Sequence, residues 1–492
     1  MSFAIAAGHD ATADTALEIL KSGGNAFDAA IGAMMTAFVA EPGMSSAGGG
    51  AFANVRKADG TCLIFDFFSQ TPKIKRPLDE VDFFPIEVDF GTTTEIFHVG
   101  KGSTAVPGSI AGLYALHEQL GTMPMEKLVE VPIQYAKDGV LINQFQHYDY
   151  KLLEKIFRID PKARSIFFKD DKLKDIGDSL KMPGLADFLE YMAKEGKDAF
   201  YKGEISGKII KDYQEGGGYL TQEDFDNYEV IIREPLSFAY KGKTILTNPF
   251  PSIGGKLIAH TMHYLEEESI SSYFLGEEHL KTLYKVLQKT DALGKYAHDL
   301  KSSYNSILRN KKHGSTSHIS IVDKWNNAIA VTMTIGEGSG YFVENTDIQL
   351  NNMLGEAALL PNGFHSWDQD VRLSSMMAPT IVLDGNRDVE IVTGSAGASR
   401  IASAITQILH YLIDYKLSVE QAVNLSRVHL EHGVFNVEHG FKHNLKADFF
   451  EDELREWDNK SLFFGGAHTI LNRKGSLYAS GDDRRDGVIR ID

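Results

Sequence analysis

The sequence predicts an α+β fold in which sheets and helices are stacked in layers. Helical patterns dominate the first third and the middle of the chain, whereas short β-rich runs dominate after about Ser315. Several of these runs are close enough in sequence to pair as antiparallel hairpins. Neither a repeat nor a low-complexity linker separates the regions, so we expect one compact unit rather than a string of domains. Such a mixture is typical of stacked sheet and helix layers.

The first third of the chain predicts three helices and a hairpin. Residues Ala11–Leu20 have helical spacing and end before a glycine pair, as a helix C-terminus should. Residues Asn25–Ala40 are apolar nearly all round, which predicts a fully buried helix. The runs Ala51–Arg56 and Cys62–Phe68 predict two strands joined by a tight turn. A proline opens the helical stretch Gly108–Leu120.

The remainder of the chain divides at about residue 315. From Met125 to about residue 298 we expect mostly amphipathic helix, with a capping signal at Thr221. Beyond it, helices are predicted at Ser399–Tyr415 and Ser418–Leu425. The strands predicted there are Ser317–Asp323, Ala328–Ile335, Thr380–Asp384, Val389–Thr393 and Thr469–Leu471.

Composition excludes several classes of protein. Hydrophobic residues make up 43% and charged residues 24% of the 492 residues, as in ordinary globular proteins. No apolar run approaches the roughly 18 residues that span a bilayer, and the first residues show no secretory signal. We therefore expect a cytoplasmic protein without a membrane partner. The formal net charge of −17 disfavours nucleic acid as a partner, and a homodimer is left open.

Glycine clusters and hydroxyl residues mark the candidate chemistry. Thr316 stands where a polar stretch enters a predicted strand, on the end of a rigid element where a nucleophile could sit. The glycine-rich turn Gly394–Arg400 joins a strand to a helix, and backbone N–H groups at such a turn can form an oxyanion hole. Ser374 and Ser375 supply paired hydroxyls able to bind a carboxylate. From the residues alone, a surface loop and a plain glycine turn remain open alternatives.

Motifs that extend nearly from end to end of the chain stand in a recognisable order. They are Gly24–Ala30, Glu41-Pro42, Gly48–Gly50, Val106–Gly108, Phe200–Gly203, Asn248–Gly255, Leu350–Met353, Leu373–Met376, Gly394–Arg400, Gly465–His468 and Asp482–Arg485. In this order they resemble the γ-glutamyltranspeptidase family.

The resemblance implies a four-layer αββα N-terminal-nucleophile hydrolase, with two stacked antiparallel sheets between helical layers. It also implies a precursor that cuts itself between Ser315 and Thr316 into a large subunit, residues 1–315, and a small subunit, residues 316–492. Thr316 would then carry both the nucleophilic hydroxyl and a new α-amino group. An α-amino group titrates at about 7.7–8.0, so it is a usable base at neutral pH without burial.

The same resemblance assigns the other site residues. Thr334 matches the threonine that orients the nucleophile, and Gly397 and Ala398 match the pair whose amides form the oxyanion hole. Ser374 and Ser375 match the serines that hold the substrate's α-carboxylate. The family usually has two glycines where this chain has Gly397 and Ala398. An alanine keeps its amide as a donor unless the position needs a positive φ.

The substrate-recognition residues depart from the family pattern. Phe68 stands where the family usually has the arginine that clamps the α-carboxylate, and a ring cannot make that charge-assisted contact. After the Asn351-Asn352 pair, in which Asn352 is a further substrate-binding candidate, Glu356 replaces the aspartate that meets the α-amino group. Gly336 replaces an asparagine expected two residues after Thr334. The sequence is thus predicted to be a variant without the usual clamp.

The function favoured by the sequence is acyl transfer or hydrolysis. Through an acyl-enzyme on Thr316, the protein would cleave a γ-glutamyl or similar amide of a small molecule and pass the acyl group to water or an amine. A related acylase of glutaryl-type or polyglutamate specificity and an uncleaved binding protein on the same fold are the alternatives. No cofactor or metal is expected, because the histidines at 429, 432, 439 and 443 lack the spacing of a metal-binding helix.

Overall fold

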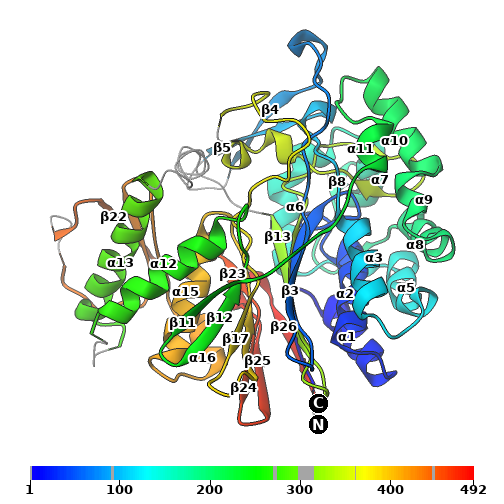
Figure 1. Cartoon of the computed structure of the whole chain (residues 1–492). Helices are drawn as coiled ribbons and strands as arrows, with labels where there is room; N and C mark the ends of the chain where they lie inside the picture. The colour runs from blue at the N-terminus through cyan, green and yellow to red at the C-terminus, as the bar shows by residue number, and fades with distance from the viewer. Residues whose placement is uncertain (1–2, 90–93, 270–273, 297–314, 361, 446–448) are drawn as a thin grey trace.

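A computed structural model gives the arrangement of the chain in space. It describes residues 3–89, 94–269, 274–296, 315–360, 362–445 and 449–492. Two antiparallel sheets lie face to face in the middle of the molecule, and a layer of helices covers the outer face of each (Figure 1). The predicted α+β fold with four αββα layers is therefore confirmed.

The first sheet combines strands from both ends of the chain. Its order is β10 (Ile231–Arg233), β3 (Cys62–Phe67), β2 (Gly50–Arg56), β14 (Ala328–Thr334), β13 (Thr316–Val322), β1 (Ala4–Ala7) and β26 (Val488–Ile491). The predicted hairpin β13–β14 lies near the centre, where Thr316 pairs with Thr334 and Ala330 with Ser320. Residues on both sides of position 315 thus contribute strands to one sheet.

The second sheet takes four of its six strands from the last third of the chain and two from the middle. Its order is β11 (Leu236–Tyr240), β12 (Lys243–Thr247), β17 (Thr380–Leu383), β18 (Val389–Thr393), β24 (Thr469–Arg473) and β25 (Ser476–Ser480). The smaller elements include the hairpin β4 (Phe84–Asp89) and β5 (Thr94–Val99), and the sheet β20 (Val428–Glu431), β21 (Val434–Glu438) and β22 (Glu453–Trp457).

The space between the two sheets is filled by small and β-branched side chains. Alternate strand residues point to opposite faces, so Ile319 and Ile321 of β13 face the helices. Val322, from the other face of β13, packs with Ala330 of β14 and Ile381 of β17 between the sheets. The alanines on this face let the sheets approach closely enough for their backbones and side chains to form one core.

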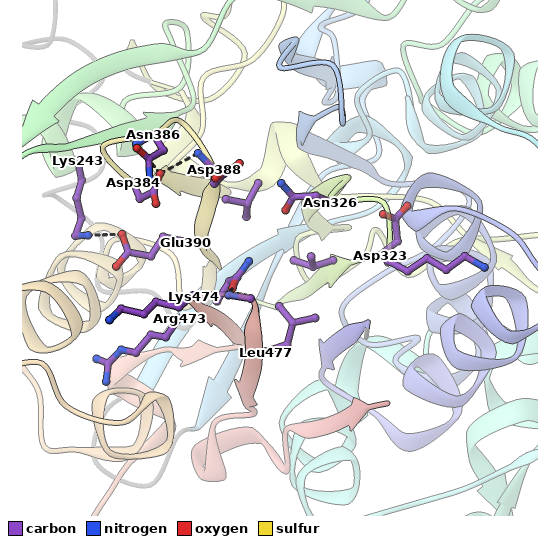
Figure 2. Close-up of a pocket in the computed structure, with 15 residues that line it drawn as sticks. Lys243, Asp323, Asn326, Asp384, Asn386, Asp388, Glu390, Arg473, Lys474 and Leu477 are labelled. Carbon is purple, nitrogen blue, oxygen red and sulfur yellow. Dashed lines mark hydrogen bonds and ion pairs between the residues drawn. The ribbon is translucent and has the colours of Figure 1, made fainter. Parts of the chain in front are cut away.

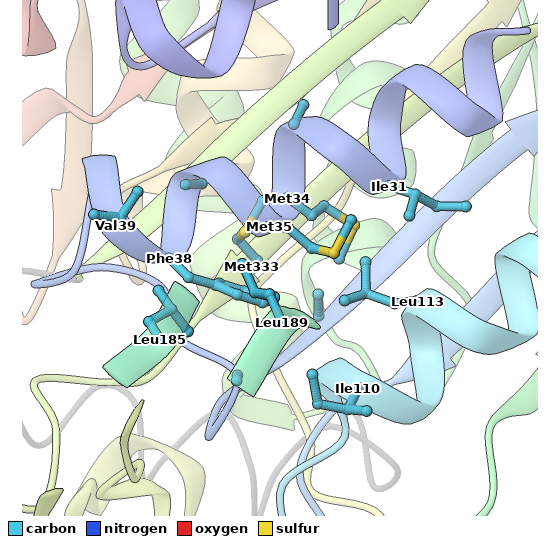
Figure 3. Close-up of a cluster of buried hydrophobic side chains, with 14 of the residues drawn as sticks. Ile31, Met34, Met35, Phe38, Val39, Ile110, Leu113, Leu185, Leu189 and Met333 are labelled. Atoms are coloured by element: carbon cyan, nitrogen blue, oxygen red, sulfur yellow. The ribbon is translucent and has the colours of Figure 1, made fainter. Parts of the chain in front are cut away.

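The first helical layer packs on the outer face of the first sheet. Its main members are α1 (Asp10–Lys21), α2 (Ala26–Ala40), α3 (Ser109–Leu120), α5 (Glu130–Asp138), α6 (Gln144–Phe157), α7 (Pro161–Phe167), α8 (Pro183–Glu195) and α10 (Glu204–Glu215). Helix α2 is buried on every side, as its composition predicted. Figure 3 shows Met34 and Phe38 of α2 amid Leu113 of α3, Leu189 of α8 and Met333 of β14.

The second helical layer covers the other sheet. It consists of α12 (Gly254–Glu267), α13 (Glu277–Tyr296), α15 (Arg400–Ile413) and α16 (Val419–Asn424). Every residue of α15 is buried. Among the described residues, none of the helices is both long and apolar enough to cross a membrane.

The prediction of mostly helix between Met125 and residue 298 is only partly right. Residues 270–273 and 297–298 of this stretch lie outside the described part of the chain. Within it, β10 completes the edge of the first sheet, and the hairpin β11–β12 forms the edge of the second. Lys241 and Gly242 both take positive φ values, 46° and 78°, which suits a two-residue hairpin turn. The missed signal in the sequence was the alternation of Leu236, Phe238 and Tyr240 just before this turn.

Candidate active site

Thr316 is the first residue of β13 and lies directly opposite Thr334 of β14. The Thr334 hydroxyl donates a hydrogen bond of 2.5 Å to the carbonyl oxygen of Ser315, and it accepts one of 2.9 Å from the Gly336 amide. The carbonyl that Thr334 contacts belongs to the Ser315–Thr316 peptide bond. A donor on this oxygen polarises the carbonyl towards attack by a nearby hydroxyl.

A small cavity of about 50 Å³ brings together most of the predicted site residues. Its apolar walls come from methionines, Leu359, Ala358 and Ile401, which lie on loops and on the first turn of α15. The predicted site residues that line it are Phe68, Ser315, Thr316, Thr334, Glu356, Ser375 and Ala398. Residues distant in sequence therefore meet at one end of the sandwich, beside Thr316.

The predicted oxyanion turn follows β18 and leads into α15. A two-residue strand, β19 (Ser395–Ala396), interrupts it by pairing with β23 (Gly466–Ala467). Gly397 then takes a φ of +119°, and Ala398 a φ of +49°. Position 398 thus has the positive φ that favours glycine over alanine. The backbone of Ala398 is strained, because a left-handed conformation brings a Cβ too close to the following carbonyl oxygen. Such strain is typical of functional turns.

Of the predicted substrate-binding residues, Ser375 and Glu356 line the cavity, whereas Ser374 and Asn352 are not among its lining residues. The Ser375 hydroxyl oxygen accepts from the Met377 amide at 3.0 Å, so its own proton can be donated to a ligand. Asn352 is used internally: its Oδ1 accepts from the Glu337 amide at 2.9 Å, and its Nδ2 donates to the His98 carbonyl at 3.3 Å. Asn352 therefore holds the neighbouring loops together, rather than facing the cavity.

Phe68 forms part of the cavity wall and is 1% exposed. Its ring stacks on Phe52 with centroids 5.4 Å apart. No lysine or arginine lines the cavity among the described residues. Arg372 lies close by, but its guanidinium donates to the carbonyls of Phe68 and Glu229 and lies over the Tyr228 ring. The cavity wall beside Phe68 is therefore apolar.

Sequence reasoning missed a buried charged cluster beside Thr316. Glu41, at the end of α2, accepts from Ser317 Oγ at 2.6 Å and from Thr12 Oγ1 at 3.1 Å. Burial raises the pKa of Glu41 to about 7 and that of Asp149 to about 7. Arg485 donates to the Thr316 carbonyl at 3.2 Å. In the sequence, the signal for this cluster was Glu41 itself, an acidic residue directly after a helix that is apolar nearly all round.

The histidines considered as metal ligands do not form a metal site. The His429 ring shares a hydrogen bond of 2.8 Å with Ser403 Oγ, and its other nitrogen lies 3.2 Å from a Glu431 carboxylate oxygen. His443 lies 3.1 Å from a Glu456 oxygen. Among the described residues, no group of three or more histidine, cysteine, aspartate or glutamate side chains is placed to hold a metal ion.

A far larger basin of about 750 Å³ lies at the turn ends of the sheets, where β13–β14, β17–β18 and β24–β25 reverse direction. Figure 2 shows contacts between some of its polar groups, those of Asp384 and the pair of Lys243 and Glu390. Asp384 accepts from the amides of Asn386 and Asp388 at 2.8 and 2.9 Å, and Lys243 pairs with Glu390. The Asp384 contacts stabilise the turn between β17 and β18, and the Lys243–Glu390 pair links β12 to β18.

The four-layer arrangement, with a threonine at the start of a central strand, is the type of fold found in N-terminal-nucleophile hydrolases. The solved structure of a cephalosporin acylase from Bacillus halodurans shares this fold, with a TM-score of 0.83 and 20% identity over 99% of this chain and 95% of that one. The chain belongs to the γ-glutamyltranspeptidase family, whose model matches residues 12–290 and 262–491.

Two curated relatives align with nearly the whole chain. The glutathione hydrolase proenzyme of Escherichia coli is 30% identical over 96% of this chain and 89% of that protein. The capsule biosynthesis protein CapD proenzyme of Bacillus anthracis is 26% identical over 99% of this chain and 90% of that protein. The chain is therefore a member of a family of acyltransferases and hydrolases. The two relatives have different names, one for a hydrolase and one for a role in capsule biosynthesis.

Proposed function

We propose that the chain cuts itself between Ser315 and Thr316 and that Thr316 then acts as the nucleophile of an amide-cleaving acyltransferase or hydrolase. The observation that carries the proposal is the contact of Thr334 with the Ser315 carbonyl, at the strand position where Thr316 begins β13. Both relatives described above are named proenzymes, which supports processing. The products would be residues 1–315 and 316–492.

The cutting step balances with one water molecule. The Thr316 hydroxyl oxygen adds to the Ser315 carbonyl carbon, its proton passes to the Thr316 nitrogen, and the C–N bond breaks. The resulting ester joins Ser315 to the Thr316 oxygen and leaves the α-amino group free. Water then cleaves the ester, which returns the hydroxyl to Thr316 and leaves a carboxylate on Ser315. The Thr334 hydroxyl stabilises negative charge on the carbonyl oxygen during attack.

Turnover repeats the same chemistry on an external amide. The free α-amino group takes the proton from the Thr316 hydroxyl, whose oxygen attacks the substrate carbonyl. The Ala398 amide, on the same cavity, is the candidate donor to the oxyanion together with that of Gly397. The amine of the substrate leaves with the proton, and an ester remains on Thr316. Water or a second amine then removes the acyl group.

Two acyl groups compete in this proposal. A γ-glutamyl group is suggested by the glutathione hydrolase relative, with Ser375 for its carboxylate and Glu356 for its ammonium group. The apolar wall at Phe68 favours a related acylase with another acyl group, because no cation among the described lining residues faces a carboxylate. We propose that the chain is a family variant without the usual clamping arginine.

The first test is the intact mass of the purified protein under denaturing conditions, with sequencing of its N-termini. Cleavage would leave a fragment that starts Thr-Ser-His-Ile, with a mass of about 19.6 kDa as the corresponding share of the 54.5 kDa chain. A single 54.5 kDa chain in active preparations would overturn the proposal. If such a chain also lacks amidase activity, the uncleaved binding protein becomes the better explanation.

A further inference from the structure

Two carboxylates and one guanidinium are buried behind the strand that carries Thr316. Glu41 is 2% exposed, Asp149 8% and Arg485 5%, and they come from the end of α2, from α6 and from the short helix η7 (Asp483–Arg485). Both carboxylates, together with Asp482, act electrostatically on Arg485 and favour its charged form. Gly8 and Gly43 leave room for this cluster, since a Cβ there would lie 2.4 Å from Glu41 and 2.1 Å from Asp149.

The cluster contacts the nucleophilic strand at two successive residues. Arg485 Nη1 donates to the Thr316 carbonyl at 3.2 Å, and Ser317 Oγ donates to Glu41 at 2.6 Å. Because strand side chains alternate, Ser317 points towards the helices while the Thr316 side chain points to the cavity. The contacts therefore restrain the backbone of Thr316 without occupying the space in which it reacts.

We propose that Arg485, balanced by Glu41 and Asp149, is a positioning residue that holds Thr316 after cleavage and keeps its new α-amino group unprotonated at neutral pH. This inference rests on the proposed function. Cleavage removes the covalent tether on one side of Thr316, and a free strand terminus frays unless other contacts hold it. The remaining contacts are the ladder to Thr334 and those made by Arg485 and Glu41.

The charge of Arg485 acts on the amine through space. The nitrogen and carbonyl oxygen of one residue are separated by two backbone carbons, so the amine lies within roughly 7 Å of Nη1. A positive charge at that distance lowers an amine's pKa by about one unit. Other charged groups near this position are Glu337, which lines a cavity with Ser315, Glu356 on the opposite side, and Arg400 and Asp482 near Arg485.

The charge of the two carboxyls changes around neutral pH, whereas Arg485 stays positive. Burial lowers the pKa of Arg485 only to about 10, so it is a cation at neutral pH. Burial raises the pKa of Glu41 and of Asp149 to about 7, so each carboxyl is partly neutral there. About pH 7 the two carboxyls together carry about one negative charge and offset Arg485 in sum, but it is the guanidinium that contacts Thr316 itself. Removing Arg485 should therefore raise the pKa of the Thr316 amine, and removing either carboxylate should lower it.

The test measures the α-amino group directly and needs no substrate. The cleaved protein is labelled with trace acetic anhydride across pH 5–10, and mass spectrometry quantifies acetylation of the peptide that begins at Thr316. We expect Arg485→Met to raise the amine's pKa by about one unit and Arg485→Lys to restore it. Glu41→Gln and Asp149→Asn should lower it. Arg490→Met removes another C-terminal arginine, paired with Asp10 and Asp14, and should change nothing.

The outcomes separate this inference from the proposed function. If no peptide beginning at Thr316 is found, the self-cleavage proposal fails. If cleavage proceeds but the Thr316 amine titrates identically in the wild type, Arg485→Met and Arg485→Lys, the inference is overturned and the proposed function stands. If Arg485→Met does not fold, a shift caused by Asp149→Asn in the expected direction supports the inference, and an unchanged titration contradicts it.

Discussion

The two ends of the sandwich differ in a way that shows what makes a site. The basin at the turn ends is about 750 Å³ and rich in charges, whereas the cavity at Thr316 is about 50 Å³. In the basin, Asp384 serves the amides of its own turn and Lys243 pairs with Glu390. At Thr316, the Thr334 hydroxyl contacts the carbonyl of the preceding residue, and the strained turn at Ala398 lines the cavity. Arrangement of donors, rather than volume, distinguishes the two ends.

The largest effect should come from removing the nucleophile. We expect Thr316→Ala to remain uncut and to lose at least about a thousandfold in amidase activity, because no other hydroxyl replaces its oxygen. Intact mass and hydrolysis of a γ-glutamyl anilide or an acyl anilide measure both effects. Asp384→Ala, at the basin, should weaken a turn but leave cutting unchanged. Normal cutting of Thr316→Ala would place the nucleophile elsewhere.

The buried Glu41 should make stability depend on pH. Its pKa is raised from an ordinary 4.5 to about 7 in the folded protein, so its neutral form stabilises the fold below pH 4.5. That contribution is lost as the pH rises through 7. The free energy of unfolding, measured in urea, should therefore be lower at pH 8 than at pH 5. We expect Glu41→Gln to reduce this difference between the two pH values by up to about 3 kcal/mol. Glu215→Gln, at an exposed position, is the control and should keep the pH dependence of the wild type. The same pH dependence of unfolding in Glu41→Gln and in the wild type would contradict the prediction.

The apolar wall at Phe68 should determine how γ-glutamyl donors bind. A guanidinium there could form a charge-assisted contact with the α-carboxylate, worth roughly tenfold in affinity. We expect Phe68→Arg to lower KM for a γ-glutamyl anilide by about that factor, with little change for an acyl anilide without a carboxylate. Phe68→Leu keeps the wall apolar and should not improve KM. An unchanged KM in Phe68→Arg would show that the acyl group is recognised elsewhere.

The smallest effect concerns the strained alanine. Ala398 has a φ of +49°, which glycine adopts without a Cβ clash. We expect Ala398→Gly to stabilise the protein by about 0.5–1 kcal/mol in thermal or urea unfolding, after the entropy of glycine is deducted. Ala396→Gly, in the neighbouring strand β19, lacks this strain and should destabilise instead. A loss of stability in both variants would contradict the strained-turn account.

Local patterns were enough to predict much of the fold. The stretch Asn25–Ala40, apolar nearly all round, became α2, and the alternating runs around residues 324–327 became the β13–β14 hairpin at the expected place. The edge hairpin β11–β12 was not predicted, because the alternation of Leu236, Phe238 and Tyr240 covers only five residues within an otherwise helical stretch. The two terminal strands β1 and β26 are only four residues long, too short for periodicity to show.

The sequence by itself determined the layered α+β character, the strand that begins near Thr316 and the glycine turn with Ala398, because turn and alternation signals are local, whereas Glu356 was found only through the family resemblance. Only the tertiary structure decided that these residues meet at one cavity, that Ala398 is strained, and that Asn352 is engaged elsewhere. The Glu41, Asp149 and Arg485 cluster also needed the fold, since its members lie more than a hundred residues apart. Burial and charge pairing are properties of packing, and no local pattern contains them.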